Sequence, residues 1–264
     1  MVTARELLIY LSLIYKGKWD DICKAVQEKK RVVPEEVKRM VGTLEYNAVT
    51  LLDEGYPQVL MHGNKPPFVL FYKGNLSILK DRHKFLGVIG SRNPTRYGLE
   101  QGERILDEAI SRNSEFALVS GMAKGIDSAM ERVGLRHETD VVSVLGNGID
   151  SCYPKSSSDL YMSNSPHSLI LSEYPPGVKP EAENFPFRNR IIAMLSDTLF
   201  LVEADERSGS SITLSYALDY GKDIITIPEP LDSKMKLNNL MIRDGAMVAL
   251  EGRDLLGAMN FQTR

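Results

Sequence analysis

The stretch Phe85-Leu86-Gly87-Val88-Ile89-Gly90-Ser91-Arg92 decides the fold class of this chain. It is a short apolar run that ends in glycine, serine and a positive charge, and a helical pattern of apolar residues follows it. Similar runs, each separated from the next by a helical pattern, recur at Ala117 to Val119, Val141 to Leu145, Leu169 to Leu171, Thr198 to Val202 and Ile224 to Ile227. Parallel strands that are covered on both faces have this continuous apolar character. The sequence therefore predicts an α/β fold with a mostly parallel sheet and helices on both faces.

The first 64 residues differ from the rest in their pattern of apolar residues. Apolar residues recur there at helical spacing, as in Leu7, Leu11 and Ile14, and Pro34 suits the first turn of a helix, so we expect three or four short helices. The run Phe68 to Tyr72 predicts a strand at the edge of the main sheet. Because 264 residues exceed the usual size of one domain, we expect a helical module over residues 1–64 and an α/β domain over residues 65–264.

The composition gives no global attraction to nucleic acid, because the net charge is −3. A site for a polyanion would need positive groups that are gathered locally. Two cysteines match no metal or redox spacing, and neither do the four histidines, His62, His83, His137 and His167, so we expect no metal and no cofactor. No apolar stretch is long enough to cross a bilayer, and the first residues show no secretory pattern. We therefore expect a soluble, cytoplasmic protein without membrane contact.

Two glycine-containing loops follow neighbouring strands of the predicted sheet. In open parallel sheets, ligands bind beyond the carboxyl ends of the strands. Gly90-Ser91-Arg92 offers backbone N–H groups and a guanidinium that can grip a phosphate, and Ser120-Gly121-Met122-Ala123-Lys124-Gly125 offers a second anion-binding turn. Each segment alone could be an ordinary βα loop. Together they favour a shared phosphate site.

A third segment, Phe185-Pro186-Phe187-Arg188-Asn189-Arg190, joins aromatic rings to cations. Such a combination is typical of surfaces that bind single strands, because rings stack on bases and cations grip phosphates. In the alternative interpretation, Phe187 and Ile191 lie in the core and the arginines pair with Glu203 or Asp205. We expect one of the two phenylalanines to lie in the core and one of the two arginines to pair with an acid. We also expect Glu203 to be the buried partner of Arg190 or Arg207.

No catalytic constellation is evident. The chain contains neither the nucleophile elbow G-x-S-x-G nor the loop G-x-x-x-x-G-K-[ST]. We therefore expect a binding protein and not an enzyme.

Several motifs in one order carry a family resemblance. They are Gly90-Ser91-Arg92, Ser120-Gly121, Gly125-Ile126-Asp127, Tyr153-Pro154-Lys155, Ser172-Glu173-Tyr174-Pro175-Pro176-Gly177, Phe185-Pro186, Arg188-Asn189-Arg190 and Arg207-Ser208-Gly209-Ser210. Over about residues 50 to 228 this chain resembles the DNA-processing protein A family, DprA or Smf.

The resemblance implies an extended Rossmann-like domain preceded by a sterile-alpha-motif-like helical module. It also implies a protein that binds single-stranded DNA, protects incoming DNA and loads the RecA recombinase during natural transformation, without ATP hydrolysis. A homodimer through the C-terminal part of the Rossmann-like domain is implied as well. In the family the DNA pocket uses an arginine, here Arg92, a lysine, here Lys155, and a base-stacking ring, here Phe185. Backbone amides from Gly121 to Ala123 would hold a phosphate.

The expected nucleic-acid site comprises Ser91, Arg92, Gly121, Met122, Ala123, Lys155, Lys179, Phe185, Arg188, Asn189 and Arg190. This chain departs from the family pattern at Ala182, where many relatives carry a basic residue, and we expect Lys179 to substitute for it. The competing interpretation is a small-molecule enzyme of the same fold, such as a nucleoside-monophosphate phosphoribohydrolase. That group carries a catalytic glutamate after a glycine-rich loop, and the corresponding place here reads Arg207-Ser208-Gly209-Ser210-Ser211.

Overall fold

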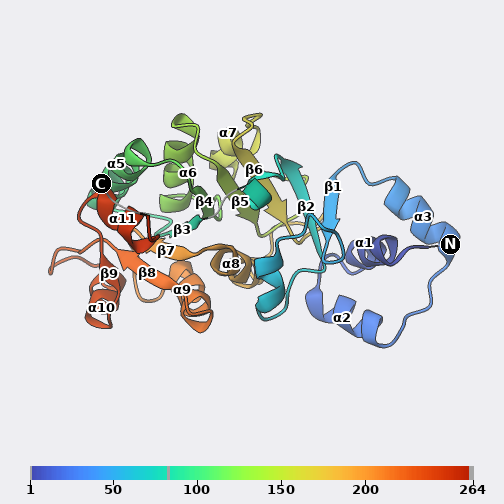
Figure 1. Ribbon diagram of the computed structural model, residues 1–264. Coiled ribbons are helices and arrows are strands. Elements are labelled where there is room, and N and C mark those ends of the chain that lie inside the picture. The colour runs from blue at the N-terminus through green and yellow to red at the C-terminus, as the bar shows by residue number, and fades with distance from the viewer. Residues whose placement is uncertain (1, 82–83, 262–264) are drawn as a thin grey trace.

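The computed structural model describes residues 2–81 and 84–261, and in this part of the chain the strands form one sheet in the order β1-β2-β6-β5-β4-β3-β7-β8-β9 (Figure 1). The strands are β1 (Asn47–Thr50), β2 (Val69–Gly74), β3 (Phe85–Ile89), β4 (Ala117–Ser120), β5 (Val141–Leu145), β6 (Ser168–Ser172), β7 (Thr198–Leu201), β8 (Asp223–Thr226) and β9 (Met247–Val248). From β6 to β9 all neighbouring strands are parallel, whereas β1 and β2 are antiparallel additions at one edge. The predicted mostly parallel sheet is confirmed.

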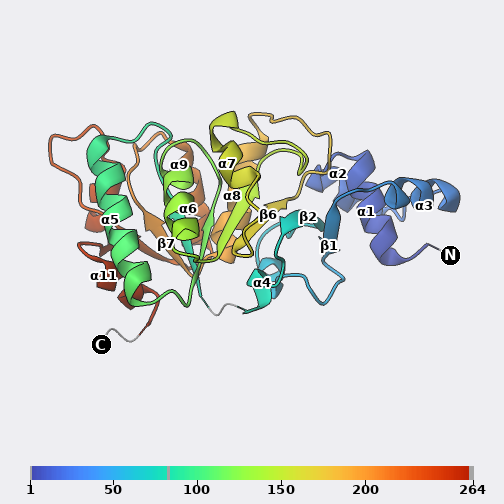
Figure 2. The same cartoon turned by 90° about the horizontal axis from the view of Figure 1, so that it is seen from above.

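Helices cover both faces of the sheet, as the sequence predicts (Figure 2). One face carries α5 (Arg96–Arg112), α6 (Ile126–Arg136) and α11 (Gly252–Ala258), and the other carries α8 (Asn184–Leu195) and α9 (Gly209–Asp219). Shorter helices are α4 (Ile78–Asp81), α7 (Ser158–Tyr161), α10 (Leu237–Arg243) and the 3-10 turns η1 (Gln58–His62) and η2 (Lys155–Ser157).

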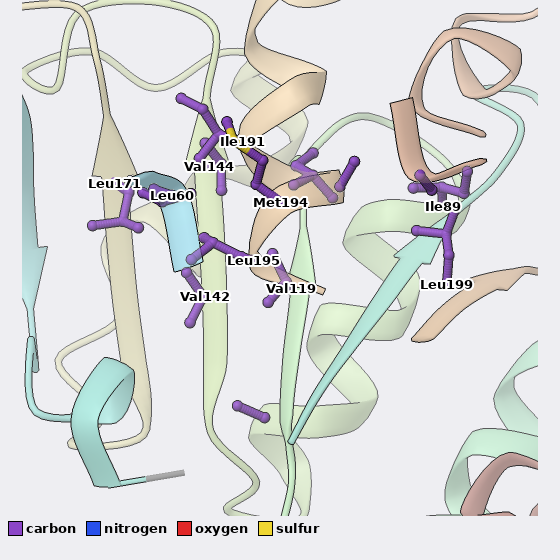
Figure 3. Packing of buried hydrophobic residues seen from close by; sticks show 14 of the residues in the cluster. Leu60, Ile89, Val119, Val142, Val144, Leu171, Ile191, Met194, Leu195 and Leu199 are labelled. Carbon is purple, nitrogen blue, oxygen red and sulfur yellow. The ribbon is translucent and has the colours of Figure 1, made fainter. Parts of the chain in front are cut away.

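The strand side chains divide between two cores because successive residues point to opposite faces. In β7, Phe200 packs with α5, α6 and α11, whereas Leu199 and Leu201 pack with α8 and α9. Figure 3 shows the second core, in which Met194 and Leu195 of α8 lie among the valines of β4 and β5.

The N-terminal part contains α1 (Ala4–Ile14), α2 (Trp19–Gln27) and α3 (Pro34–Gly42). They lie beyond β1 and β2, at the end of the molecule opposite β8 and β9 (Figure 1). Thr3 begins α1 with a capping box to Glu6, and Pro34 begins α3 at the position where its missing N–H costs nothing. The predicted short helices are confirmed.

The sheet begins at Asn47, within the residues for which the pattern predicts only helices. Strand β1 pairs with β2 over four residues and is half exposed, so its apolar content is too small to signal a strand. It takes the outermost position that the sequence assigns to the strand at Phe68 to Tyr72. The division into units 1–64 and 65–264 stays a prediction.

The order of the strands reverses beside β3. Strands β4, β5 and β6 extend the sheet on one side of β3, and β7, β8 and β9 extend it on the other. The loops after β3 and β7 therefore lead to helices on opposite faces and leave a crevice between them. The fold places its natural ligand site there.

Phe71 of β2 is fully buried and packs with Leu8 and Ile9 of α1, so it joins the N-terminal helices to the sheet. We expect Phe71→Ala to lower the free energy of unfolding by about 3 to 5 kcal/mol, because it leaves a cavity among side chains that cannot close over it. Urea unfolding measures the change. Leu231→Ala is the control, because Leu231 is 97% exposed and its truncation should change stability by less than about 0.5 kcal/mol.

Candidate nucleic-acid interface

A pocket of about 690 Å³ lies at the reversal of the strand order. Its walls come from the segments after β3, β4, β5, β6 and β7, from the first turn of α8 and from the start of α9. They include Gly90, Ser91, Arg92, Asn93, Ala123, Asp127, Tyr153, Ala182, Phe185, Arg188, Asn189, Asp205 and Ser208. Segments that are distant in the sequence thus line one concavity.

Arg92, Phe185 and Tyr153 form a cluster in the wall of this pocket. The guanidinium carbon of Arg92 lies 5.7 Å from the centroid of the Phe185 ring, which suits a cation–π interaction. The Tyr153 ring lies 5.5 Å from the same ring and is tilted by 37°. Arg92 and Tyr153 are exposed and Phe185 is half-buried, so this cluster offers a ligand one cation and two rings.

Phe185 can approach this position because residue 146 is glycine. A Cβ atom at Gly146 would lie 2.6 Å from the Phe185 ring, which is closer than such atoms approach in proteins. The glycine that ends β5 thereby creates the seat for the ring.

The loop that carries Arg92 is fixed from both sides. The Ser91 N–H donates to the Glu203 carbonyl at the end of β7, and the Ser91 carbonyl accepts from Ile126 N–H at the start of α6. Gly125 has a φ of +91°, and a Cβ atom there would lie 2.3 Å from the Ser91 carbonyl oxygen, so glycine is required at this contact.

The partner of Glu203 differs from the sequence prediction. Its buried carboxylate accepts hydrogen bonds from the backbone N–H and the hydroxyl of Thr95. The expected pairing with Arg190 or Arg207 is therefore wrong. The carboxylate instead fixes Thr95, the residue before α5, by accepting two hydrogen bonds from it.

Arg190 is a structural cation. It is 1% exposed and forms an ion pair with Glu173, in which Nη2 donates to both carboxylate oxygens over 2.7 and 2.8 Å. Its guanidinium also lies 3.7 Å from the centroid of the Phe187 ring. Phe187 thus faces Arg190 and is not part of the pocket wall.

Arg188 is buried at the base of the pocket. It is 3% exposed and donates to the carbonyl oxygens of Gly121 and Val144 and to the side chain of Asn189. Burial lowers the pKa of Arg188 to about 10. Pairing of either arginine with Glu203 or Asp205, the alternative from the sequence, is wrong, because both guanidiniums are held by groups from the strand ends.

The loop Gly121-Met122-Ala123 turns its backbone amides toward two buried carboxylates of α6. The Met122 N–H donates to Glu131 over 2.9 Å, and the backbone of Gly121 and Ala123 lies close enough to Asp127 to counter the rise of its pKa. Glu131 also accepts a bond from the Ser143 hydroxyl. Of the amides that the resemblance assigns to a phosphate, that of Met122 is thus bound to a carboxylate of the protein itself.

Burial raises the pKa of both carboxyl groups. The pKa of Glu131 rises to about 8, chiefly through burial and further through the charge of Asp127. The pKa of Asp127 rises to about 6, also through burial, and the nearby Arg188 limits that rise. At neutral pH, Glu131 therefore carries a proton for much of the time.

The remaining predicted residues lie around the pocket. Lys155 is exposed in η2, two residues after Tyr153. Lys179 is exposed beside Pro180, and Ala182 lines the pocket itself. Asn189 lines the pocket and donates to the Gly209 carbonyl at the start of α9.

The described residues contain no cluster of three histidine, cysteine, aspartate or glutamate side chains that could hold a metal ion. His137 and His167 each bond to an aspartate, Asp107 and Asp140 respectively, and His83 lies outside the described residues. In residues 2–81 and 84–261, none of the helices combines the length and hydrophobicity that a bilayer-crossing segment needs.

The family model described as DNA recombination-mediator protein A matches residues 47–260. The chain belongs to this family. The DNA processing protein DprA of Streptococcus pneumoniae is 37% identical over 220 residues, which cover 82% of this chain and 76% of that protein. The protein Smf of Synechocystis is 38% identical over 210 residues, 78% of this chain and 52% of its own length. The chain thus spans about half of some curated relatives and three quarters of others.

Solved structures of the recombination-mediator family agree with this fold. The X-ray structure of DprA from S. pneumoniae matches with a TM-score of 0.78 at 30% identity, over 98% of this chain and 94% of that one. DNA processing protein A from Helicobacter pylori, whose structure concerns its single-stranded DNA binding mode, matches with a TM-score of 0.69 at 24% identity, over 81% of this chain and 95% of that one. The second likeness shows the shared fold.

Three side chains that shape this site, Tyr153, Asp127 and Glu131, are missing from the residues that the sequence predicts for it. Tyr153 could have been found, because it precedes the lysine of the Tyr-Pro-Lys motif. Asp127 and Glu131 stand four residues apart on α6, a spacing that places both on one helix face. Their direction toward the preceding loop is visible only in the fold.

Because the folded state holds a proton on Glu131 that the unfolded chain releases, this group stabilises the fold at low pH and loses that contribution as the pH rises toward about 8. We expect Glu131→Gln to remove part of the decline in the free energy of unfolding between about pH 5 and about pH 9. Glutamine stays neutral, and its amide oxygen can accept from the Met122 N–H while its amide nitrogen donates to the Ser143 hydroxyl oxygen. At about pH 9, the free energy of unfolding of the variant should differ from that of the wild type by on the order of 1 to 3 kcal/mol.

Urea unfolding across this pH range is the measurement. Glu138→Gln is the control, because Glu138 is exposed at the end of the same helix. A pH profile of Glu131→Gln that parallels the wild type would contradict the assignment.

Proposed function

We propose that this chain binds single-stranded DNA in the pocket beside β3 and acts as a recombination mediator, which protects incoming DNA and loads the RecA recombinase during natural transformation. The observation that carries the proposal is the Arg92–Tyr153–Phe185 cluster in the wall of that pocket. Membership of the recombination-mediator family supports it, and so does the single-stranded DNA binding of the structurally similar H. pylori protein.

The cluster suits unpaired bases better than a duplex. Phe185 and Tyr153 offer ring faces, and a base stacked on such a ring contributes about 1 to 3 kcal/mol whatever its identity. In a duplex the bases already stack on each other and cannot reach the rings. Arg92 beside them can pair with the phosphate that links two stacked nucleotides.

The structure leaves six of the predicted DNA contacts accessible or partly accessible: Ser91, Arg92, Ala123, Lys155, Lys179 and Phe185. We assign Gly121, Met122, Arg188, Asn189 and Arg190 a supporting role in which their bonds to one another and to Asp127, Glu131 and Glu173 shape the pocket. Ala123 contributes to its wall. Lys179, at its rim, is our candidate for the cation that relatives supply at the position of Ala182.

We infer that the chain works by binding and not by catalysis, in the cytoplasm, as a homodimer that contacts RecA through the family's C-terminal surface. The competing function is hydrolysis of nucleoside monophosphates. It requires a catalytic acid after residue 207, where this chain has serine and glycine. Release of free base from nucleoside monophosphates by the purified chain would establish the enzyme instead.

We expect Arg92→Ala and Phe185→Ala to weaken binding of single-stranded oligonucleotides about tenfold or more for all sequences alike, since each removes one phosphate or base contact. Only Arg92→Ala should also reduce the slope of log affinity against log salt, by about 0.7. Fluorescence anisotropy over a salt series measures both quantities.

Arg112→Ala is the matched control, because Arg112 is an exposed arginine in the last turn of α5, at the end remote from the Arg92 loop. Equal affinities of Arg92→Ala, Phe185→Ala and Arg112→Ala for single strands would exclude this pocket as the DNA site.

A further inference from the structure

A second pocket, of about 460 Å³, adjoins the first on the side of α6. The loop after β3 and the start of α6 form it, and Ser156 of η2 closes one side. Its lining residues are Arg92, Asn93, Pro94, Leu99, Lys124, Gly125, Ser128, Arg132 and Ser156. Its lining residues from Lys124 to Arg132 are not among the residues of the expected nucleic-acid site, although Lys124 and Gly125 stand in the second anion-binding turn that the sequence predicts.

The two pockets are continuous around one loop. Arg92 and Asn93 line both of them. Tyr153 lines the first pocket and Ser156 lines the second, so the exposed Lys155 lies in the segment between them. A chain molecule bound at Arg92 therefore meets the second pocket as its next surface.

Lys124 supplies the accessible charge of this second pocket. It is exposed, and its ammonium donates to the Asn93 side chain over 3.1 Å. An ammonium has three donors, so this bond leaves two for a ligand. Asn93 thereby holds the charge of Lys124 beside that of Arg92.

Arg132 forms the wall and does not serve as a second free cation. It makes a bidentate ion pair with Asp159 and also donates to the carbonyl oxygens of Ser128 and Ser156. These bonds tie η2 to α6 and fix the width of the pocket. Since Asp159 balances Arg132, the net charge of the lining comes from Arg92 and Lys124.

The opposite side of the first pocket carries charges of both signs, since the exposed Lys234 and Lys236 flank Met235 of its lining. After β7 the exposed residues are Asp205, Glu206 and Arg207, with one more acid than base, and Asp205 lines the pocket. A polyanion that leaves Arg92 toward α9 passes the Asp205 carboxylate of the pocket wall, whereas one that leaves toward α6 meets Lys124.

We propose that the second pocket is a phosphate subsite for single-stranded DNA, in which Lys124 binds the backbone of nucleotides that follow those held by Arg92 and Phe185. The strand therefore crosses the loop Ser91-Arg92-Asn93 toward α6. This inference rests on the proposed function. It adds the direction in which the DNA strand runs and assigns Lys124 a contact to the DNA backbone that is independent of base sequence.

Lys124→Ala tests the subsite with two oligothymidylates, one of about 4 and one of about 16 nucleotides, which span the usual site sizes of single-strand binders. We expect the variant to bind the longer strand roughly fivefold more weakly at low salt, with a salt slope smaller by about 0.7. Affinity for the shorter strand should stay within about twofold of wild type, since that strand ends within the first pocket. Lys124→Arg should restore the binding of the longer strand.

Arg136→Ala is the matched control, because Arg136 is an exposed cation in the last turn of the same helix. If wild type binds neither oligothymidylate, the proposed function itself fails. If wild type binds both and Lys124→Ala equals Arg136→Ala on the longer strand, the subsite is wrong while the first pocket stands. An equal loss on both strands would also overturn it, because Lys124 would then belong to the first pocket.

Discussion

The reversal of strand order beside β3 is the constraint on which the rest of this structure depends. Since β4 and β7 both pair with β3 and their connections leave toward opposite faces, the chain cannot close over the carboxyl end of β3. The opening that results is the larger pocket. The segments that could fill it instead supply its walls, and each wall brings a different chemistry: amides and arginine from β3, rings from the start of α8 and from the segment after β5, and acids from β7.

This chain has more acids than bases, yet exposed cations lie around its pocket, while other charged side chains near the strand ends are buried. Arg190 pairs with Glu173 below the surface, and Arg188 lies buried near Asp127 and donates to the carbonyl oxygens of Gly121 and Val144 at the strand ends. These groups set the positions of the loops at the cost of desolvation. Arg92, Lys124 and Lys155 stay exposed above them, so the field that a ligand meets differs from the net charge of the chain.

The N-terminal helices are attached to the same scaffold. The Trp19 ring stacks on Phe68 at 5.2 Å, and its indole N–H donates to the Pro66 carbonyl. The ammonium of Lys65 lies over the rings of both Trp19 and Phe187. The guanidinium of Arg190 also lies over the Phe187 ring. A row of alternating rings and cations thus connects α2 to α8, the helix whose first turn carries Phe185.

The sequence by itself determined the parallel sheet, its helices on both faces and the gathering of Arg92 and Phe185 at one edge, because hydrophobic periodicity and strand-end motifs are local properties. It missed β1, whose four half-exposed residues carry too little periodicity, and it assigned to Glu203 a partner other than Thr95. Only the tertiary structure decided that Arg188 and Arg190 are internal and that Glu131 accepts the Met122 amide. Which charge pairs with which depends on distances between segments far apart in the chain, and no local pattern encodes them.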